Sequence, residues 1–340
     1  MTADVMTIGL DLAKNTFYAV ALDTHGHQRW QRKLRRSQLL DFLARQPVAL
    51  VAMEACAGAH YWARAVESLG HQACLLPAQH VRSYRRGQKN DYNDATAIAE
   101  AALHGRIRPA RPKTLAEQEL QCLHRMRQLQ VAERTRLINQ LRGLLAEFGR
   151  VMPQGRSAFE RSLLPLLEVD AGLPEGRRQM LLRRWDAYRR LNDELDWYDR
   201  RLQEQVRTDP ACQRLMEIPG FGPVVSSAFR AVLGDGRQFR RGREAAASLG
   251  LVPRQHSTGG RTQLLGITKR GDRQLRSLLT HAARAVVRRA AHQDDRLSRW
   301  IQALLQRRGH NKTVIAVANK LARIGWVILA REEHYQPQTS

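Results

Sequence analysis

Short apolar runs separated by turns fill the N-terminal third of the chain. The alternation of apolar and polar positions predicts three strands at hairpin spacing, over residues 7–11, 17–22 and 28–34. Ser37 is a candidate N-cap for a short amphipathic helix that begins near Leu39. A buried strand over 48–53, a helix over 59–69 that ends at Gly70, and a strand over 73–76 are expected to follow. Three antiparallel strands, a helix, a strand, a helix and a strand are the order of a ribonuclease-H-like core, so residues 1–112 are predicted to form a RuvC-like α/β domain.

From about Leu115 the periodicity becomes helical. The apolar residues Leu137, Leu141, Leu144 and Phe148 repeat at heptad-like spacing, and Gly149 and Pro153 are expected to end that helix. After a stretch broken by Pro165, Gly172, Pro174 and Gly176, the spacing resumes at Leu181, Trp185, Tyr188, Leu195 and Leu202. Residues 113–208 are therefore predicted to be an antiparallel coiled-coil hairpin. An ordinary bundle within one protomer, a dimerising arm and a nucleic-acid clamp all remain open.

Asp209-Pro210 marks the next boundary. Beyond it, residues 209–331 are rich in glycine and basic side chains and are predicted to be mostly helical, with a polar tail over 332–340. The expected fold class is therefore α/β plus α.

Charge narrows the choice of partner. The 340 residues contain 56 Lys plus Arg against 32 Asp plus Glu, which gives a formal net charge of +24. No apolar stretch approaches the roughly 20 residues needed to span a bilayer. The N-terminal residues lack the basic-then-apolar layout of a signal peptide, so nucleic acid is favoured over a membrane as the partner. The four cysteines form no CxxC pair, which fits a reducing cytoplasm, and no phosphate-binding GxxxxGK[ST] loop is present.

Four acids stand out in this basic chain: Asp11 and Glu54 at the ends of two predicted strands, and Asp91 and Asp94 three residues apart on a predicted helix. Carboxylates that converge repel one another unless cations neutralise them. Two Mg²⁺ ions roughly 4 Å apart would do so and would polarise a scissile phosphate, with Mn²⁺ as a substitute. The alternative is that Asp11 and Glu54 merely close their strands while Asp91 caps a helix.

Basic residues surround the candidate chemistry and are expected to contact phosphates; each is equally well explained as part of a solvated loop. They are Arg82, Arg85, Arg86, Lys89, Arg106, Arg108, Arg111 and Lys113 near the acids, and Arg254, Arg261, Lys269 and Arg270 further on.

Two loops of the C-terminal half are candidate nucleic-acid elements. Residues 218–224 resemble the hairpin of a helix-hairpin-helix element, whose glycines expose backbone amides to phosphate, although a Gly-Pro loop is also an ordinary connection. In residues 251–261, Ser257 lies among glycines near basic side chains and is a candidate nucleophile. Spacing alone favours an ordinary turn there.

Several segments together resemble the DEDD transposases of the bacterial insertion-sequence one-ten family, in its eleven-eleven branch. The matching segments are Ile8–Lys14, Met53–Cys56, Gly58–Arg64, Lys89–Ala95, Ile218–Pro223, Gly250–Pro253, His256–Gly260 and Gly266–Asp272. One departure is Ala57, where the family pattern has glycine.

The resemblance implies a metal site on Asp11, Glu54, Asp91 and Asp94 and a nucleophilic Ser257. It implies a recombinase that cuts and rejoins target and donor DNA through a transient phosphoserine, guided by a structured bridge RNA. It further implies a homo-oligomer, dimer to tetramer, in which one protomer supplies the acids and another the serine. A cytoplasmic, nucleoid-associated protein is expected. The alternatives are a metal-dependent junction-resolving nuclease, in which water attacks, and a non-enzymatic nucleic-acid-binding protein.

Overall fold

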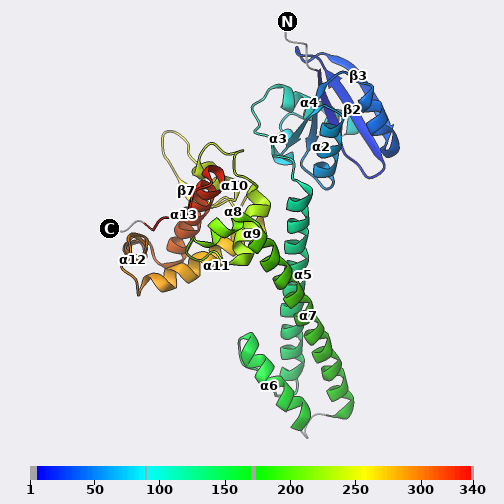
Figure 1. Cartoon of the computed structure of the whole chain (residues 1–340). Coiled ribbons are helices and arrows are strands. Elements are labelled where there is room, and N and C mark those ends of the chain that lie inside the picture. The colour runs from blue at the N-terminus through cyan, green and yellow to red at the C-terminus, as the bar shows by residue number, and fades with distance from the viewer. Residues whose placement is uncertain (1–5, 89, 170–173, 338–340) are drawn as a thin grey trace. The chain divides into compact units, whose positions relative to one another are not determined.

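The chain forms two compact units, Met1–Thr114 and Leu115–Ser340, in a computed structural model that describes residues 6–88, 90–169 and 174–337 (Figure 1). The first unit contains a β-sheet with helices beside it, and the second unit is mostly helical. Both parts of the expected fold class, α/β followed by α, are therefore confirmed at this level.

A five-stranded sheet organises the described part of the first unit, in the order β3-β2-β1-β4-β5. The strands are β1 (Met6–Asp11), β2 (Thr16–Leu22), β3 (Gln28–Arg35), β4 (Ala49–Glu54) and β5 (Gln72–Leu76). β1 pairs antiparallel with β2, and β2 with β3, whereas β1, β4 and β5 run parallel. All five predicted strands are present within one or two residues of their expected bounds.

Helices cover both faces of this sheet. They are the 3₁₀ turn η1 (Arg36–Gln38), α1 (Leu39–Ala44), α2 (Ala59–Ser68), α3 (Ala78–Val81) and α4 (Asp91–Leu103). Because side chains alternate along a strand, Ala19 and Ala21 of β2 pack with α1 and α2, while Val20 and Leu22 pack against α4. The predicted cap at Ser37 is wrong: Ser37 lies inside η1, and the Gln38 side chain accepts a hydrogen bond from the Arg35 backbone N–H instead.

The second unit opens with two long helices, α5 (Leu115–Ala146) and α7 (Glu175–Thr208), with α6 (Arg156–Val169) between them in sequence. Three side-chain hydrogen bonds give their direction: Arg127 to Asp199 at 2.6 Å, Arg134 to Asn192 at 2.9 Å, and Arg184 to Gln140 at 2.7 Å. The residue number of the partner on α5 rises from one bond to the next, while the residue number of the partner on α7 falls. The two helices therefore pair antiparallel.

The apolar seam of α5 differs from the predicted one. Leu137, Leu141 and Leu145 are buried at four-residue spacing, whereas Leu144 is 44 % exposed. The reason is α6, whose Phe159, Leu163 and Leu167 join the same core, so this end of α5 faces two helices rather than one. The five predicted seam residues of α7, which begin at Leu181 and end at Leu202, are all buried.

Not every proline and glycine between the long helices breaks a helix. α6 runs through Pro165, because Leu163 and Leu167 on either side of it are buried, and this packing offsets the roughly 3 kcal/mol that an interior proline costs. Gly176 lies in the first turn of α7. Gly172 falls outside the described residues.

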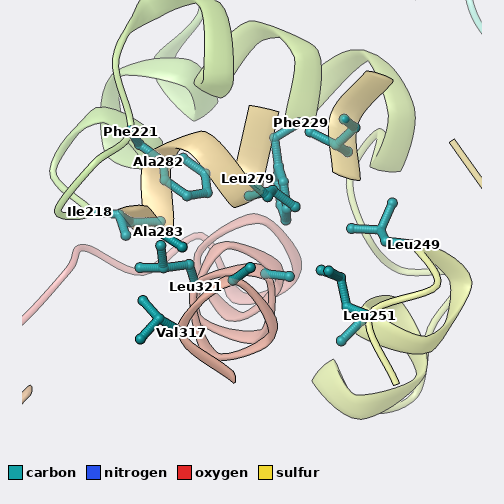
Figure 2. Packing of buried hydrophobic residues seen from close by; sticks show 14 of the residues in the cluster. Ile218, Phe221, Phe229, Leu249, Leu251, Leu279, Ala282, Ala283, Val317 and Leu321 are labelled. Atoms are coloured by element: carbon teal, nitrogen blue, oxygen red, sulfur yellow. The ribbon is translucent and has the colours of Figure 1, made fainter. Parts of the chain in front are cut away.

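The remainder of the second unit packs around one long helix. Its elements are α8 (Pro210–Met216), α9 (Pro223–Leu233), α10 (Gly242–Ser248), β6 (Pro253–Gln255), β7 (Leu264–Ile267), α11 (Arg273–Ala290), α12 (Arg296–Arg308) and α13 (His310–Arg331). Figure 2 shows side chains of three helices in this core: Val317 and Leu321 of α13, Leu279 of α11 and Phe229 of α9.

One expectation fails at α13. This helix has 22 residues and enough apolar character to span a membrane by length and composition, although the sequence pattern predicted no such stretch. Its apolar content has another cause, because 56 % of the apolar window is buried inside the protein and Val317, Ala318 and Leu321 have no exposed surface. Lys320 and Arg323 interrupt the apolar run, so the sequence contains no unbroken apolar stretch of that length.

Candidate active site

Asp11 and Glu54 end two adjacent parallel strands in register. Leu10 of β1 pairs with Met53 of β4, so the next residue on each strand is one of the two acids. Leu10 and Met53 have no exposed surface, whereas Asp11 and Glu54 are half-buried. The two carboxylates therefore lie side by side, just outside the core, at the carboxyl ends of β1 and β4.

Gly9 allows α4 to approach that edge. A Cβ atom at position 9 would lie 2.1 Å from the carbonyl oxygen of Ala95 and 2.5 Å from the backbone nitrogen of Ala99. Only glycine permits this contact between strand and helix backbones. Asp94 directly precedes Ala95, so the same contact brings the first turn of α4 to the end of β1.

The pKa of Glu54 reports the resulting crowding of charge. Burial raises this pKa above its usual value, the negative charge of Asp94 raises it further, and the positive charge of Arg85 lowers it. Arg85 also donates to Asp94, with 3.2 Å between Nη1 and Oδ1. Glu54 and Asp94 thus interact as like charges, with Arg85 as their nearby cation.

Cys56 adds a second reporter that the sequence pattern did not single out. Burial raises the pKa of its thiol, and the negative charges of Glu54 and Asp11 raise it further. The tight turn after β4, in which the Cys56 N–H donates to the Glu54 carbonyl at 2.8 Å, holds the thiol beside both acids. The negative charges of Asp11 and Glu54 therefore both act on the Cys56 thiol.

Asp91 is the first residue of α4 and is exposed. It does not cap the helix: the N-cap is Asn90, whose side chain accepts from the Asn93 N–H at 2.8 Å. The alternative that Asp91 serves as a cap is therefore wrong. Asp91 and Asp94 share one face of α4, since residues three apart on a helix are neighbours.

The acids lie in one region but are not drawn tightly together. Among the described residues, no three His, Cys, Asp or Glu side chains are close enough to hold a metal ion as they stand. The donor set itself consists of carboxylate oxygens, which are the ligands that Mg²⁺ and Mn²⁺ prefer.

Most candidate phosphate contacts of the first unit are at the surface. Arg82, Arg106 and Arg108 are exposed, while Arg86 lies 4.0 Å from Glu100. Lys113 is half-buried, and its backbone N–H donates to His60. Arg111 is also half-buried, and Lys89 lies outside the described residues.

Ser257 lies on an exposed hairpin of the second unit. β6 and β7 pair antiparallel, and a bridge between Thr258 and Arg261 closes the tip. Gly259 and Gly260 between them have φ of +53° and +76°, which suits a tight hairpin turn. Ser257 precedes this turn, and its hydroxyl accepts a hydrogen bond from the Gln255 side chain at 2.8 Å. Arg254, Arg261, Lys269 and Arg270 are exposed on or beside the hairpin.

Two glycines anchor the base of the Ser257 hairpin. A Cβ at Gly250 would lie 2.3 Å from the Arg270 carbonyl oxygen, and one at Gly271 would lie 1.8 Å from the Ser248 carbonyl oxygen. Both have positive φ, so glycine is required twice over. The Thr268 N–H donates to the Val252 carbonyl at 2.9 Å across the same crossing. The backbone at the root of the hairpin is therefore fixed, while its tip is exposed.

The loop 218–224 connects α8 to α9 and is held by packing. Ile218 and Phe221 are buried in the core around α13. Gly220, with φ of +83°, leaves no room for a Cβ, which would lie 3.0 Å from the Ala282 carbonyl oxygen. This loop has the turn that its resemblance to a helix-hairpin-helix element predicts, and its apolar residues serve the core.

Comparisons with known proteins identify the class. A family model described as a transposase, of the DEDD type found in IS110 elements, matches residues 8–149, and a model for transposases of the IS116/IS110/IS902 family matches residues 212–298. The first match contains all four acids, and the second contains Ser257. The chain is thus a DNA transposase.

Relatives similar along the whole length place the chain within its family. It is 47 % identical to a probable family 20 transposase of Pseudomonas aeruginosa, over 97 % of this chain and 98 % of the relative. It is 40 % identical to the transposase of IS1328 from Yersinia enterocolitica, over 96 % of this chain and 97 % of that protein. It is 39 % identical to the transposase of IS1111A from Coxiella burnetii, over 98 % and 92 %. The protein belongs to the IS110 family of insertion-sequence transposases.

Proposed function

We propose that this transposase cuts and rejoins DNA with two groups of residues. Asp11, Glu54, Asp91 and Asp94 form the metal site, and Ser257 is the nucleophile. The observation that carries the proposal is the approach of α4 to β1 at Gly9, which brings Asp94 beside the paired strand ends of Asp11 and Glu54.

The sheet supports a RuvC-like, ribonuclease-H-like assignment for the first unit. Three antiparallel strands, with β4 and β5 added parallel to β1, give the order expected for that fold. We infer a RuvC-like domain over 1–112, a coiled-coil linker over 113–208 and a transposase domain over 209–331, with the tail beyond it. The antiparallel pairing of α5 and α7 supports the linker.

The carboxylate donor set suits divalent cations, which would draw the four acids closer than they stand in this structure. Converging carboxylates with a raised Glu54 pKa favour a cation that removes their mutual repulsion. Bound Mg²⁺, or Mn²⁺ in its place, would supply Lewis-acid polarisation of the scissile phosphate. Asp11, Glu54, Asp91 and Asp94 would hold the ions, and Arg85 would give up its hydrogen bond to Asp94 as they bind.

Ser257 would exchange one phosphodiester for another. Its Oγ attacks the scissile phosphorus and loses its proton to water, and the bond from phosphorus to the leaving DNA oxygen breaks as that oxygen takes up a proton. A DNA hydroxyl then attacks the phosphoserine and loses its proton to water, while the bond from phosphorus to Ser257 Oγ breaks and that oxygen takes up a proton, so the strand is rejoined without ATP. The exposed cations Arg254, Arg261, Lys269 and Arg270 would stabilise the charge that develops on the phosphate.

Guidance by a structured RNA completes the proposal. Base pairing by a guide would leave the protein to contact backbone and helix shape, which suits its excess of arginine. We infer a homo-oligomer, dimer to tetramer, in which one protomer contributes the acids and another the serine, and a nucleoid location that follows from DNA binding. The loop 218–224 and the exposed arginines of the first unit are the candidate phosphate contacts.

A recombination assay with two single variants tests this division of labour. Ser257→Ala and Asp11→Asn should each abolish strand exchange between donor and target plasmids supplied with the element's non-coding RNA. Thr258→Ala is the matched control for the serine, because Thr258 is the next residue of the same exposed hairpin. Glu67→Gln, on the exposed side of α2, is the control for the acids.

The outcomes separate the competing functions. If Ser257→Ala still cleaves DNA while Asp11→Asn does not, the protein uses water as nucleophile and acts as a junction-resolving nuclease. If Asp11→Asn retains full activity, the carboxylate site is structural and the proposal is wrong. Omitting the RNA should stop recombination in the parent protein, and undiminished exchange without it would remove RNA guidance from the proposal.

A further inference from the structure

A large groove crosses the second unit at a place that the proposed chemistry does not use. It has a volume of about 1680 Å³ and lies among α10, α12, α13 and the segment 333–337. Eight Lys and Arg side chains line it: Arg240, Arg241, Arg243, Arg296, Lys312, Lys320, Arg323 and Arg331. The volume exceeds the roughly 300–1,000 Å³ typical of small-molecule sites.

The carboxylates of the groove already have partners. Asp295 caps α12, where its side chain accepts from the Leu297 and Ser298 N–H groups at 2.9 and 3.1 Å. Glu333 lies 3.7 Å from Arg331. These two acids leave an excess of positive charge among the Lys and Arg side chains that line the groove.

The cations also repel one another. Burial lowers the pKa of Lys320, and the positive charges of Arg323 and Arg296 lower it further. Lys320 lies over the ring of Trp300, with 4.7 Å from Nζ to the ring centroid. Repulsion among these positive charges therefore destabilises the folded state, and a bound polyanion would relieve that repulsion.

The floor of the groove is apolar. Leu251, Ile267, Ile315 and Ile324 line it, together with Trp300. A duplex presents only phosphates and groove edges to such a surface, because its base faces are stacked inside. An unpaired strand has exposed base faces for the apolar floor and phosphates for the cationic rim, which is the usual combination in single-strand sites.

The groove continues into the hairpin that carries Ser257. Pro253 of β6 and Ile267 of β7 line the groove, and they pair with each other at the root of that hairpin. Asn319 of α13, which also lines the groove, donates to the Leu251 carbonyl at 3.1 Å. The floor of the groove and the strand before Ser257 are therefore one continuous surface.

From these features, we propose that the groove binds an unpaired DNA strand next to the end that reacts at Ser257. The link to Ser257 rests on the proposed function, whereas strand binding is inferred from the cations and the apolar lining of the groove alone. DNA is the polyanion on which a transposase acts, and strand cleavage is the step that releases an unpaired end.

Equilibrium binding of the full-length protein tests the proposal. The probe is a fluorescein-labelled single-stranded oligodeoxynucleotide of about 12 nucleotides, read by anisotropy in EDTA so that no cleavage chemistry contributes. The double variant Lys312→Ala/Arg323→Ala removes two exposed cations of α13. The control Arg183→Ala/Arg207→Ala removes two exposed cations of α7 outside the groove and lowers the net charge equally.

We expect the groove variant to bind about tenfold more weakly and the control to bind like the parent protein. The slope of log affinity against log salt should fall by about 1.4 in the groove variant, because each phosphate contact with a single strand contributes roughly 0.7. Equal loss in both double variants would mean that net charge alone is responsible and would overturn the proposal.

Two further arms decide the identity of the strand. Unlabelled duplex DNA and single-stranded RNA of the same sequence serve as competitors, and each should compete less well than unlabelled single-stranded DNA. Better competition by either one would overturn the assignment to unpaired DNA. Photocrosslinking of a 5-iodouracil-containing DNA strand should label the peptides around Trp300 and residues 310–331, and labelling confined to other parts of the protein would overturn it too. Both readouts are independent of Ser257 and the four acids, so they fail separately from the proposed function.

Discussion

Gly9 and Ala95 touch backbone to backbone: a Cβ on Gly9 would lie 2.1 Å from the Ala95 carbonyl oxygen. This contact positions Asp94 against the strand ends of Asp11 and Glu54, so one missing methyl group controls the geometry of the acidic site.

Gly9→Ala should therefore destabilise the fold and abolish DNA cleavage. The neighbours are backbone atoms that cannot rotate away, so we expect a loss of about 3 kcal/mol in the free energy of unfolding, the upper end for overpacking. Chemical denaturation and a cleavage assay check both effects. Gly143→Ala on α5 is the control, because a Cβ there meets nothing within 4 Å; it should be neutral or slightly stabilising. Equal behaviour of the two variants would contradict the close contact.

The pKa of Glu54 should respond in opposite directions to its two neighbours. Removing the negative charge with Asp94→Asn should lower it toward the usual range, whereas removing the positive charge with Arg85→Met should raise it further. Carbon-detected NMR titration of the Glu54 carboxyl group measures both. A carboxylate must be ionised to bind a cation. Cleavage activity should therefore be lost at a higher pH in Arg85→Met than in the parent protein as the solution is acidified. A Glu54 pKa that moves the same way in both variants would contradict the arrangement.

His124 should make stability depend on pH. Burial lowers the pKa of this histidine to about 4, and its Nε2 lies 3.0 Å from Ser227 Oγ. Since the folded pKa is depressed, the unfolded chain binds the proton more tightly, and stability falls as pH drops from 6.5 toward 4. The loss at the bottom of that range should be about 3 kcal/mol. Urea denaturation across this range should give a flatter profile for His124→Gln than for the parent. His281→Gln, at an exposed position of α11, should leave the slope unchanged; an unaltered slope in His124→Gln would contradict the prediction.

Gly271→Ala should disrupt the root of the Ser257 hairpin. A Cβ there would lie 1.8 Å from the Ser248 carbonyl oxygen, and φ of +73° adds strain. We expect a loss of about 3 kcal/mol or more and faster hydrogen exchange over residues 251–268. Gly266→Ala in β7 is the control, because nothing lies within 4 Å of its Cβ position. Unchanged exchange in Gly271→Ala would show that the crossing does not hold the hairpin.

Local pattern predicted the sheet and the placement of its acids. The runs around Leu10 and Met53 are short and apolar, so an acid at the end of each was visible before the fold was known. The neighbours of those acids were not, because Arg85 and Cys56 meet them only through tertiary packing.

Errors arose where two elements compete for one residue. Leu144 fits a heptad, but α6 packs beside α5, and Leu145 is buried there in place of Leu144. Asp91 is a good capping residue, but Asn90 precedes it and takes that position. The groove could not be predicted from the sequence, because its cations come from separate segments and only the folded chain brings Arg241, Arg296 and Arg323 together.

In the proposed function, strand exchange passes through a covalent bond between Ser257 and DNA. The most direct measurement is mass spectrometry of the denaturation-resistant adduct formed on a donor DNA in the presence of the guide RNA and Mg²⁺, after digestion of protein and DNA. We predict a nucleotide phosphate on the peptide that contains Ser257, absent from Ser257→Ala and retained in Thr258→Ala. Efficient recombination by the parent protein with no such adduct, or with the phosphate on another residue, would contradict it.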